Sequence, residues 1–120
     1  MSELQPCLDV APGEWLAGAR RLAESGHSWF GWLTALDAGD GALTLLCQVA
    51  DISAPGAMRT HTMRTHLPAG TPVASLTPVY AGAAWCERET AELFGLAITG
   101  FEDPSGLGLR PLLLPAGFPD

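Results

Sequence analysis

The densest group of reactive side chains in the sequence is the charged stretch Glu87-Arg88-Glu89, followed by Glu92. Two carboxylates in one site can act as a general acid and a general base. Residues two apart on a helix point about 200° apart around its axis, so Glu87 and Glu89 are not expected to converge on one substrate. Arg88 and Glu92 are one turn apart and can form an ion pair. Two interpretations stay open: a structural ion network where helices or subunits meet, and a solvated helix face.

Cysteine and histidine chemistry is the second possibility, and the spacing does not favour it. Cys86 lies near the start of the same expected helix, where a thiolate could be stabilised, but a catalytic pair would need His61 or His66 beside it. These histidines are five residues apart on an expected strand, so they point to opposite faces and cannot share a metal ion as a local pair. We therefore interpret Cys86 as a small buried thiol and the histidines as exposed strand residues, and we expect no metal site.

Phosphate and nucleic-acid binding are also not expected. The glycine-bearing stretch 100–108 contains neither a GxGxxG pattern nor a Walker lysine, and the chain has no lysine at all. With 6 basic and 13 acidic residues, the formal charge is −7, which disfavours a nucleic-acid backbone or an anionic membrane surface as a partner. The three cysteines have no CxxC spacing and are one too few for an all-cysteine iron–sulfur cluster.

The size and composition indicate one domain that covers residues 1–120 and has a partner. Hydrophobic residues make up 48% of the chain and charged residues only 16%, against about 25% in typical soluble domains. Such a surface has apolar area that an assembly would cover. No stretch has the length of uninterrupted apolar sequence that a membrane span needs, and no signal peptide is recognisable.

The elements that must position the charged stretch follow from periodicity and turn residues. A helix begins at Pro12 and ends before Gly26, because its apolar residues recur at helical spacing. Strands are expected at 29–36, 43–52 and 58–67, helices at 76–81 and 83–94, and short extended pieces at 96–99 and 109–114. This order predicts an α+β fold of two layers, in which helices pack on a mixed, mainly antiparallel sheet.

The region 75–115 also resembles a known family. Glu87-Arg88-Glu89, then two residues, an acid, two apolar residues and Gly95, is similar to the signature of the 30 kDa subunit family of respiratory complex I, also known as the C subunit of NADH–quinone oxidoreductase. The flanking stretches also resemble those of the family. They are Ser75-Leu76-Thr77, Tyr80, Ala84-Trp85, Leu96-Ala97-Ile98-Thr99-Gly100 and Arg110-Pro111-Leu112-Leu113-Leu114-Pro115.

Several departures from the family pattern bear on docking. Ala91 stands where the family has an aromatic residue, Glu92 where it has aspartate, and Phe101 where it has histidine. Residues 104–108 lengthen the loop before Arg110, and no basic tail follows the Leu-Pro run. The contacts of this chain with its neighbours are therefore expected to differ from those of typical members.

The resemblance implies a non-catalytic structural subunit of the hydrophilic arm of the enzyme that passes electrons from NADH to quinone and translocates protons. It implies no active site and no cofactor on this chain, with FMN and iron–sulfur clusters on partner subunits. The implied partners are the large quinone-site subunit and the adjacent iron–sulfur subunit, at the cytoplasmic face of the bacterial inner membrane. The residues that it marks as structural or interface positions are Trp85, Glu87, Arg88, Glu89, Glu92, Phe94, Gly95 and Arg110.

Two alternatives remain beside this interpretation. The first is the equivalent subunit of a membrane-bound [NiFe]-hydrogenase-type complex, which would use the same structural positions. The second is a small stand-alone enzyme that uses Cys86 or the pair Glu87 and Glu89.

Overall fold

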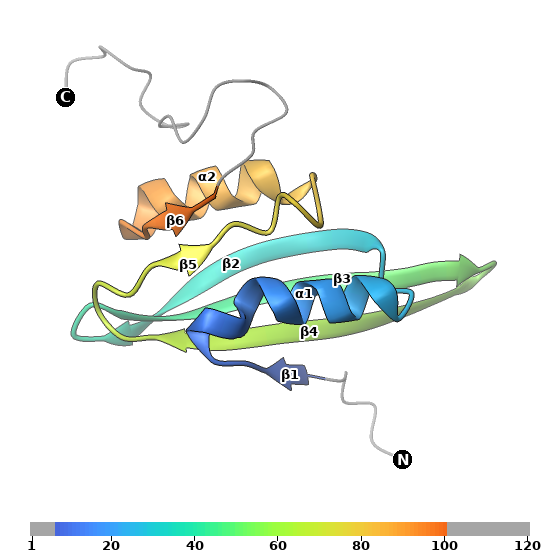
Figure 1. Cartoon of the computed structure of the whole chain (residues 1–120), viewed down its shortest axis with the longest axis horizontal. Helices are drawn as coiled ribbons and strands as arrows, with labels where there is room; N and C mark the ends of the chain where they lie inside the picture. The colour runs from blue at the N-terminus through green and yellow to red at the C-terminus, as the bar shows by residue number, and fades with distance from the viewer. Residues whose placement is uncertain (1–6, 101–120) are drawn as a thin grey trace, which may run out of the picture.

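The computed structural model describes residues 7–100 and shows two helices beside a four-stranded sheet (Figure 1). The elements are β1 (Cys7–Asp9), a 3-10 turn (Pro12–Glu14), α1 (Trp15–Glu24), β2 (Trp29–Gly39), β3 (Ala42–Ala54), β4 (Ala57–Leu67), β5 (Val73–Ala74), α2 (Ala83–Phe94) and β6 (Ile98–Thr99). The large sheet has the order β1-β4-β3-β2, and β5 pairs with β6 in a second, parallel sheet. The predicted α+β fold on a mixed, mainly antiparallel sheet is confirmed.

Strands β2, β3 and β4 form an antiparallel meander that makes up most of the sheet. The first turn is built from Gly39, Asp40 and Gly41, which all have positive φ, and the Asp37 side chain accepts a hydrogen bond of 2.8 Å from the Gly39 N–H. Glycine and aspartate tolerate this backbone region, which explains the tight reversal. The three predicted strands are confirmed, and each is longer than the sequence pattern indicated.

The sheet owes its mixed character to β1, which the sequence did not predict as a strand. Cys7, Leu8 and Asp9 pair in parallel with Thr62, Met63 and Arg64 of β4. Both oxygens of Asp9 accept hydrogen bonds from the Arg64 guanidinium, at 2.6 and 2.9 Å. Three residues are too few to show a period, so only the long-range pairing reveals this strand.

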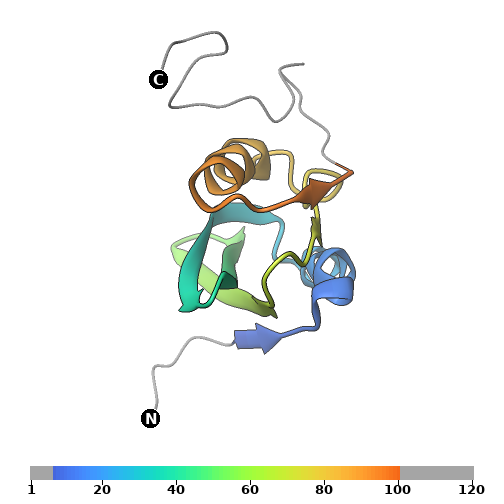
Figure 2. The ribbon, with the colours of Figure 1, turned by 90° about the vertical axis from the view of Figure 1, so that its left-hand side faces the viewer.

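The core lies between the sheet and the layer formed by the helices (Figure 2). Helix α1 buries Trp15, Ala19 and Leu22. It lies so close to β4 that a Cβ atom at Gly18 would come within 2.9 Å of the Met63 sulfur. Helix α2 packs over β2. The predicted packing of helices on the sheet is therefore found for both helices.

The segment before α2 differs from the prediction of a short helix at 76–81. It forms a turn in which the Val79 and Tyr80 N–H groups donate to the Leu76 carbonyl, at 2.9 and 2.7 Å. Pro78 disfavours the helical conformation at Thr77, which explains why no regular helix forms here. The prediction of α2 at 83–94 is correct.

Helix α2 ends where Gly95 adopts a left-handed conformation, with φ of 68°, and donates from its N–H to the Ala91 carbonyl at 2.9 Å. Glycine is the residue that favours this termination. The predicted loop 100–108 and extended piece 109–114 lie outside the described residues, apart from Gly100. No helix of the described residues 7–100 has the length and apolar character that crossing a membrane requires.

Candidate functional site

The first glutamate of the signature, Glu87, is an internal anchor of α2. Its side chain is 1% exposed. One carboxylate oxygen accepts a hydrogen bond of 2.7 Å from the Ser75 hydroxyl, and the other accepts one of 2.7 Å from the Leu76 N–H. Glu87 therefore fastens α2 to the chain that leaves β5. Sequence reasoning missed this contact, because no local pattern links Ser75 to a residue 12 positions later.

Burial raises the pKa of Glu87, and the hydrogen bonds from the Leu76 N–H and the Ser75 hydroxyl oppose this shift. Both donors are neutral, so they offset only part of the cost of removing the charge from water. The two oxygens are occupied and almost shielded from solvent, which leaves no room for a substrate. Glu89 is half-buried on the other side of the helix, so the two carboxylates lie apart, as helical geometry predicted.

The outer side of α2 carries large apolar side chains. Trp85 is 60% exposed and Leu93 is 56% exposed, and Glu89 and Glu92 lie between them at helical spacing. We call these four residues the docking face. Arg88, in contrast, points inward and is 6% exposed. The structure thus divides the signature between an inner side, with Glu87 and Arg88, and the docking face.

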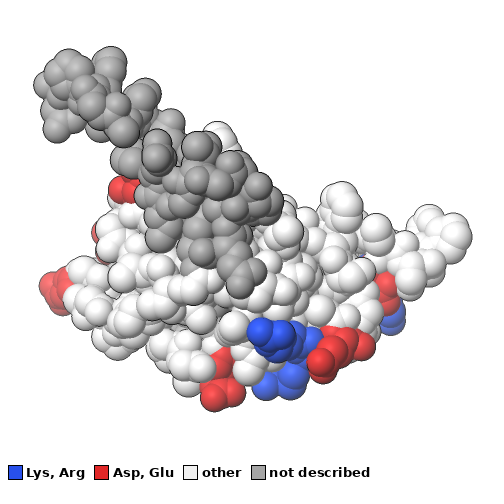
Figure 3. All heavy atoms as spheres, turned by 45° about the horizontal axis from the view of Figure 1, so that its top comes forward, with Lys and Arg blue, Asp and Glu red and all other residues white. Residues whose placement is uncertain are grey.

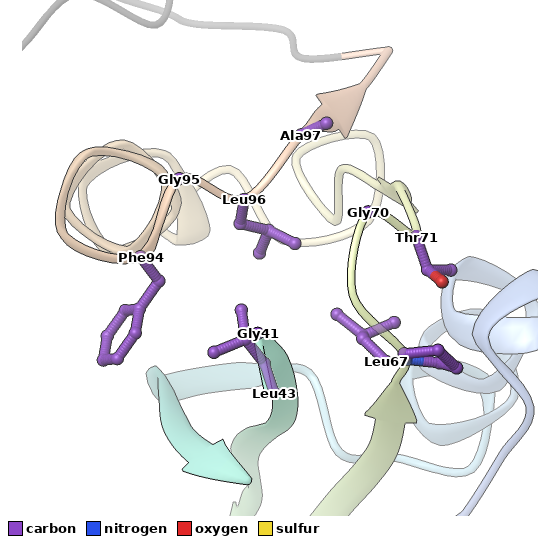
Figure 4. A pocket seen from close by; sticks show the side chains of 10 residues that line it. Gly41, Leu43, Leu67, Gly70, Thr71, Phe94, Gly95, Leu96 and Ala97 are labelled. Atoms are coloured by element: carbon purple, nitrogen blue, oxygen red, sulfur yellow. The ribbon is translucent and has the colours of Figure 1, made fainter. Parts of the chain in front are cut away.

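The last turn of α2 borders a small pocket (Figure 4). Phe94 and Gly95 lie on one side of it, and the other lining residues are Gly41, Leu43, Leu67, Pro68, Gly70, Thr71, Leu96 and Ala97. Its volume of about 80 Å³ is well below the range of about 300–1,000 Å³ for ligand pockets. None of the lining side chains titrates, so this pocket cannot support acid–base chemistry.

The cysteines and histidines of the described residues do not form an evident reactive pair. Cys47 is buried, and burial is the main reason that its pKa is raised, whereas Cys86 is half-buried. His66 is exposed, as predicted. His61 is instead half-buried, because it lies on the inner side of β4 with its ring edge-to-face against His27 at a centroid distance of 5.5 Å. The prediction of an exposed His61 was therefore wrong.

Charged side chains are sparse over the part of the surface that Figure 3 shows. White atoms dominate this view; blue side chains lie toward its lower and right edges, and red ones lie there and along the left edge. Among residues 7–100, no group of three or more histidine, cysteine, aspartate or glutamate side chains is arranged to hold a metal ion. Arg110, the remaining predicted position, lies outside the described residues.

Comparison with known proteins identifies the family. The family model of the respiratory-chain NADH dehydrogenase 30 Kd subunit matches residues 8–120. The mitochondrial NADH dehydrogenase [ubiquinone] iron-sulfur protein 3 of Candida albicans is 43% identical over 56 residues, which cover 47% of this chain and 18% of that protein. The C subunit of NADH-quinone oxidoreductase from Rhizobium johnstonii is 48% identical over 48 residues, or 40% of this chain and 22% of the relative.

The fold is shared with a solved structure, the trypsin-resistant fragment (1-134) of Nqo5. The TM-score is 0.71 at 15% identity, with 81% of this chain and 80% of that chain covered. The two sequence matches span only about one fifth of the length of the curated relatives. The shared fold is that of a small α+β domain. The chain belongs to the 30 kDa subunit family of respiratory-chain NADH dehydrogenases, as its resemblance predicted.

Proposed function

We propose that this chain is a non-catalytic structural subunit of the hydrophilic arm of NADH–quinone oxidoreductase. The observation that carries the proposal is the family match over residues 8–120, which includes the whole signature helix. The geometry of α2 supports it, because Glu87 is committed to an internal contact while Trp85 and Leu93 face outward. A helix anchored on one side and apolar on the other is suited to holding neighbouring subunits together.

The expected partners are the large quinone-site subunit and the iron–sulfur subunit beside it, and FMN and the iron–sulfur clusters would be carried by partner subunits. In this proposal the chain is held at the cytoplasmic face of the bacterial inner membrane through the complex. Its contribution to electron transfer is indirect, since it fixes the positions of subunits that carry the redox groups.

The test is assembly of the complex in the organism that encodes the chain. The chromosomal copy is deleted and then restored with an affinity-tagged full chain, and detergent-solubilised membranes are separated by native electrophoresis. We expect the tagged chain to migrate with NADH-oxidising activity and with flavin and iron, and the deletion to abolish the assembled band. Normal assembly and NADH–quinone reductase activity in the deletion strain would refute the proposal.

The same preparation separates the two alternatives. Co-isolation with a large subunit that contains nickel, in place of flavin-bearing subunits, would establish the hydrogenase-type complex. Cys86→Ala and Glu89→Gln proteins with unchanged activity in any assay found for the isolated chain would argue against a stand-alone enzyme based on these side chains.

A further inference from the structure

Helix α2 is arranged with polar residues inside and large apolar residues outside. Three of its buried residues are Glu87, Arg88 and Thr90, and the other two are the small Ala83 and Ala84. Its large apolar side chains, Trp85, Leu93 and Phe94, are exposed instead. A helix of a monomeric protein turns its apolar stripe to the core, so this inverted distribution indicates a second surface that covers the outer side.

The docking face is also negatively charged. Glu89 and Glu92 lie on it between Trp85 and Leu93, and it contains no basic residue, because Arg88 faces the core. The chain as a whole has a charge of −7 and no lysine. Charges across an interface are usually complementary, so the Glu89 carboxylate favours arginine or lysine on the opposite side. The negative charge of this face also disfavours an anionic membrane.

The docking face is held in place before any partner arrives. Glu87 fixes the helix from within through Ser75 and Leu76, and Gly95 ends the helix directly after the exposed Phe94. A surface that is already ordered loses little conformational freedom on binding, so its contacts contribute efficiently to affinity. Tryptophan is among the residues that dominate such interfaces, which makes Trp85 the main anchor.

We propose that the docking face, Trp85, Glu89, Glu92 and Leu93, binds a protein surface that has an apolar centre flanked by arginine or lysine. This inference rests on the proposed function, in which the surface belongs to another subunit of the complex. Trp85 and Leu93 enter the apolar centre, and Glu89 pairs with a basic side chain at its border.

Photo-crosslinking in the intact complex identifies what covers the face. A photoreactive amino acid replaces Leu93 in the tagged full chain, and a control chain carries it at Leu36, on β2, which is equally exposed at 56%. We expect the position 93 chain to crosslink to another subunit of the complex, at a segment that contains apolar and basic residues. Crosslinking to a second copy of this chain, or to lipid alone, would overturn the inference.

The affinity of variant chains for the crosslinked subunit tests the apolar and charged contacts of the docking face. Trp85→Ala is expected to weaken binding about 30-fold, as hot-spot residues do. Glu89→Lys is expected to weaken it about tenfold at low salt and less at high salt, because the paired charges are screened. The matched controls are Leu36→Ala for the apolar change and Glu24→Lys, at the exposed end of α1, for the same change in charge. Neither control should weaken binding appreciably.

The outcomes separate this inference from the proposed function. If the chain assembles with the complex, but position 93 does not crosslink and Glu89→Lys acts no more strongly than Glu24→Lys, the docking face is refuted while the subunit role stands. If the chain does not associate with the complex at all, both are refuted. Selective loss of binding in Trp85→Ala and Glu89→Lys, with unchanged circular dichroism, supports the docking face.

Discussion

The two buried carboxylates of the described residues, Glu87 and Asp51, have pKa values that move in opposite directions. Glu87 is 1% exposed and Asp51 is 4% exposed. Burial raises the pKa of Glu87. The pKa of Asp51 is lowered by hydrogen bonds, first those from the Ser53 hydroxyl and N–H, at 2.6 and 2.9 Å, and then that from the Arg59 guanidinium.

The difference shows that the hydrogen-bond donors around a carboxyl group, and not its burial alone, decide whether the fold favours the charged or the neutral form. Asp51 receives a cation and two local hydrogen bonds from residues on the β3–β4 hairpin. Glu87 receives two neutral donors from a segment that precedes its own helix. Asp51 therefore stabilises a hairpin as an ion, whereas Glu87 connects two separate elements at the cost of desolvating its charge.

The largest effect is expected when the anchor is removed. Glu87→Ala leaves the Ser75 hydroxyl and the Leu76 N–H buried without the acceptor that Glu87 supplies, and each unsatisfied group costs about 1–3 kcal/mol. We expect the free energy of unfolding, measured in urea, to fall by about 2–4 kcal/mol. The control Glu89→Ala should change it by less than about 0.5 kcal/mol. Equal effects of the two substitutions would contradict the anchor role of Glu87.

A smaller effect is expected for Glu87→Gln, because the amide oxygen can accept from the Leu76 N–H and the amide nitrogen can donate to the Ser75 hydroxyl. The free energy of unfolding at neutral pH, measured in urea, should stay within about 1 kcal/mol of the natural protein. A loss as large as that of Glu87→Ala would show that the charge, and not the pair of hydrogen bonds, holds the helix.

The pH dependence of stability in the natural protein and in Glu87→Gln tests the direction of the Glu87 pKa shift. A raised pKa in the folded protein means that the contribution of Glu87 is fully present below the ordinary glutamate pKa of about 4.3 and is lost as the pH rises through the higher folded value. The Gln variant does not titrate at this position. Its stability relative to the natural protein should therefore increase as the pH rises through this window, and a constant difference would contradict the raised pKa.

The smallest effect, with the opposite pH dependence, is expected for Asp51→Asn. Its amide oxygen still accepts from Ser53, and the Arg59 side chain is largely exposed, which weakens the ion pair. Because the pKa of Asp51 is lowered, its contribution is present above the ordinary aspartate pKa of about 3.9 and is lost as the pH falls through the folded value. Urea titrations should show the deficit of the variant shrinking in acid, and Asp40→Asn serves as the exposed control.

The elements that local patterns specify were predictable from the sequence. The meander followed from apolar and β-branched residues between turn signals, and the bounds of α2 followed from its composition and from Gly95. The helix predicted at 76–81 is a turn, because Pro78 disfavours the helical conformation at Thr77. Strand β1 was not predicted, because its pairing partner lies far along the chain in β4.

The candidate site was predictable as a segment but not in its orientation. The sequence separated Glu87 from Glu89 by helical geometry, yet it could not assign which side faced the core. By hydrophobicity alone Trp85 and Leu93 would point inward, whereas the structure buries Glu87 and Arg88 there. A pattern of apolar residues does not distinguish a side chain that meets its own core from one that meets another protein.

The parallel pairing of β1 with β4 and of β5 with β6 has a consequence for the order in which the chain folds. The meander closes through short turns, while Asp9 must find Arg64 at a separation of 55 residues. Closing a longer loop costs more chain entropy, so we expect the hairpins to form first and the parallel pairs to follow. Glu87 and Ser75 are only 12 residues apart, so their contact closes a much shorter loop. A nascent chain is therefore expected to orient α2 before β1 completes the sheet.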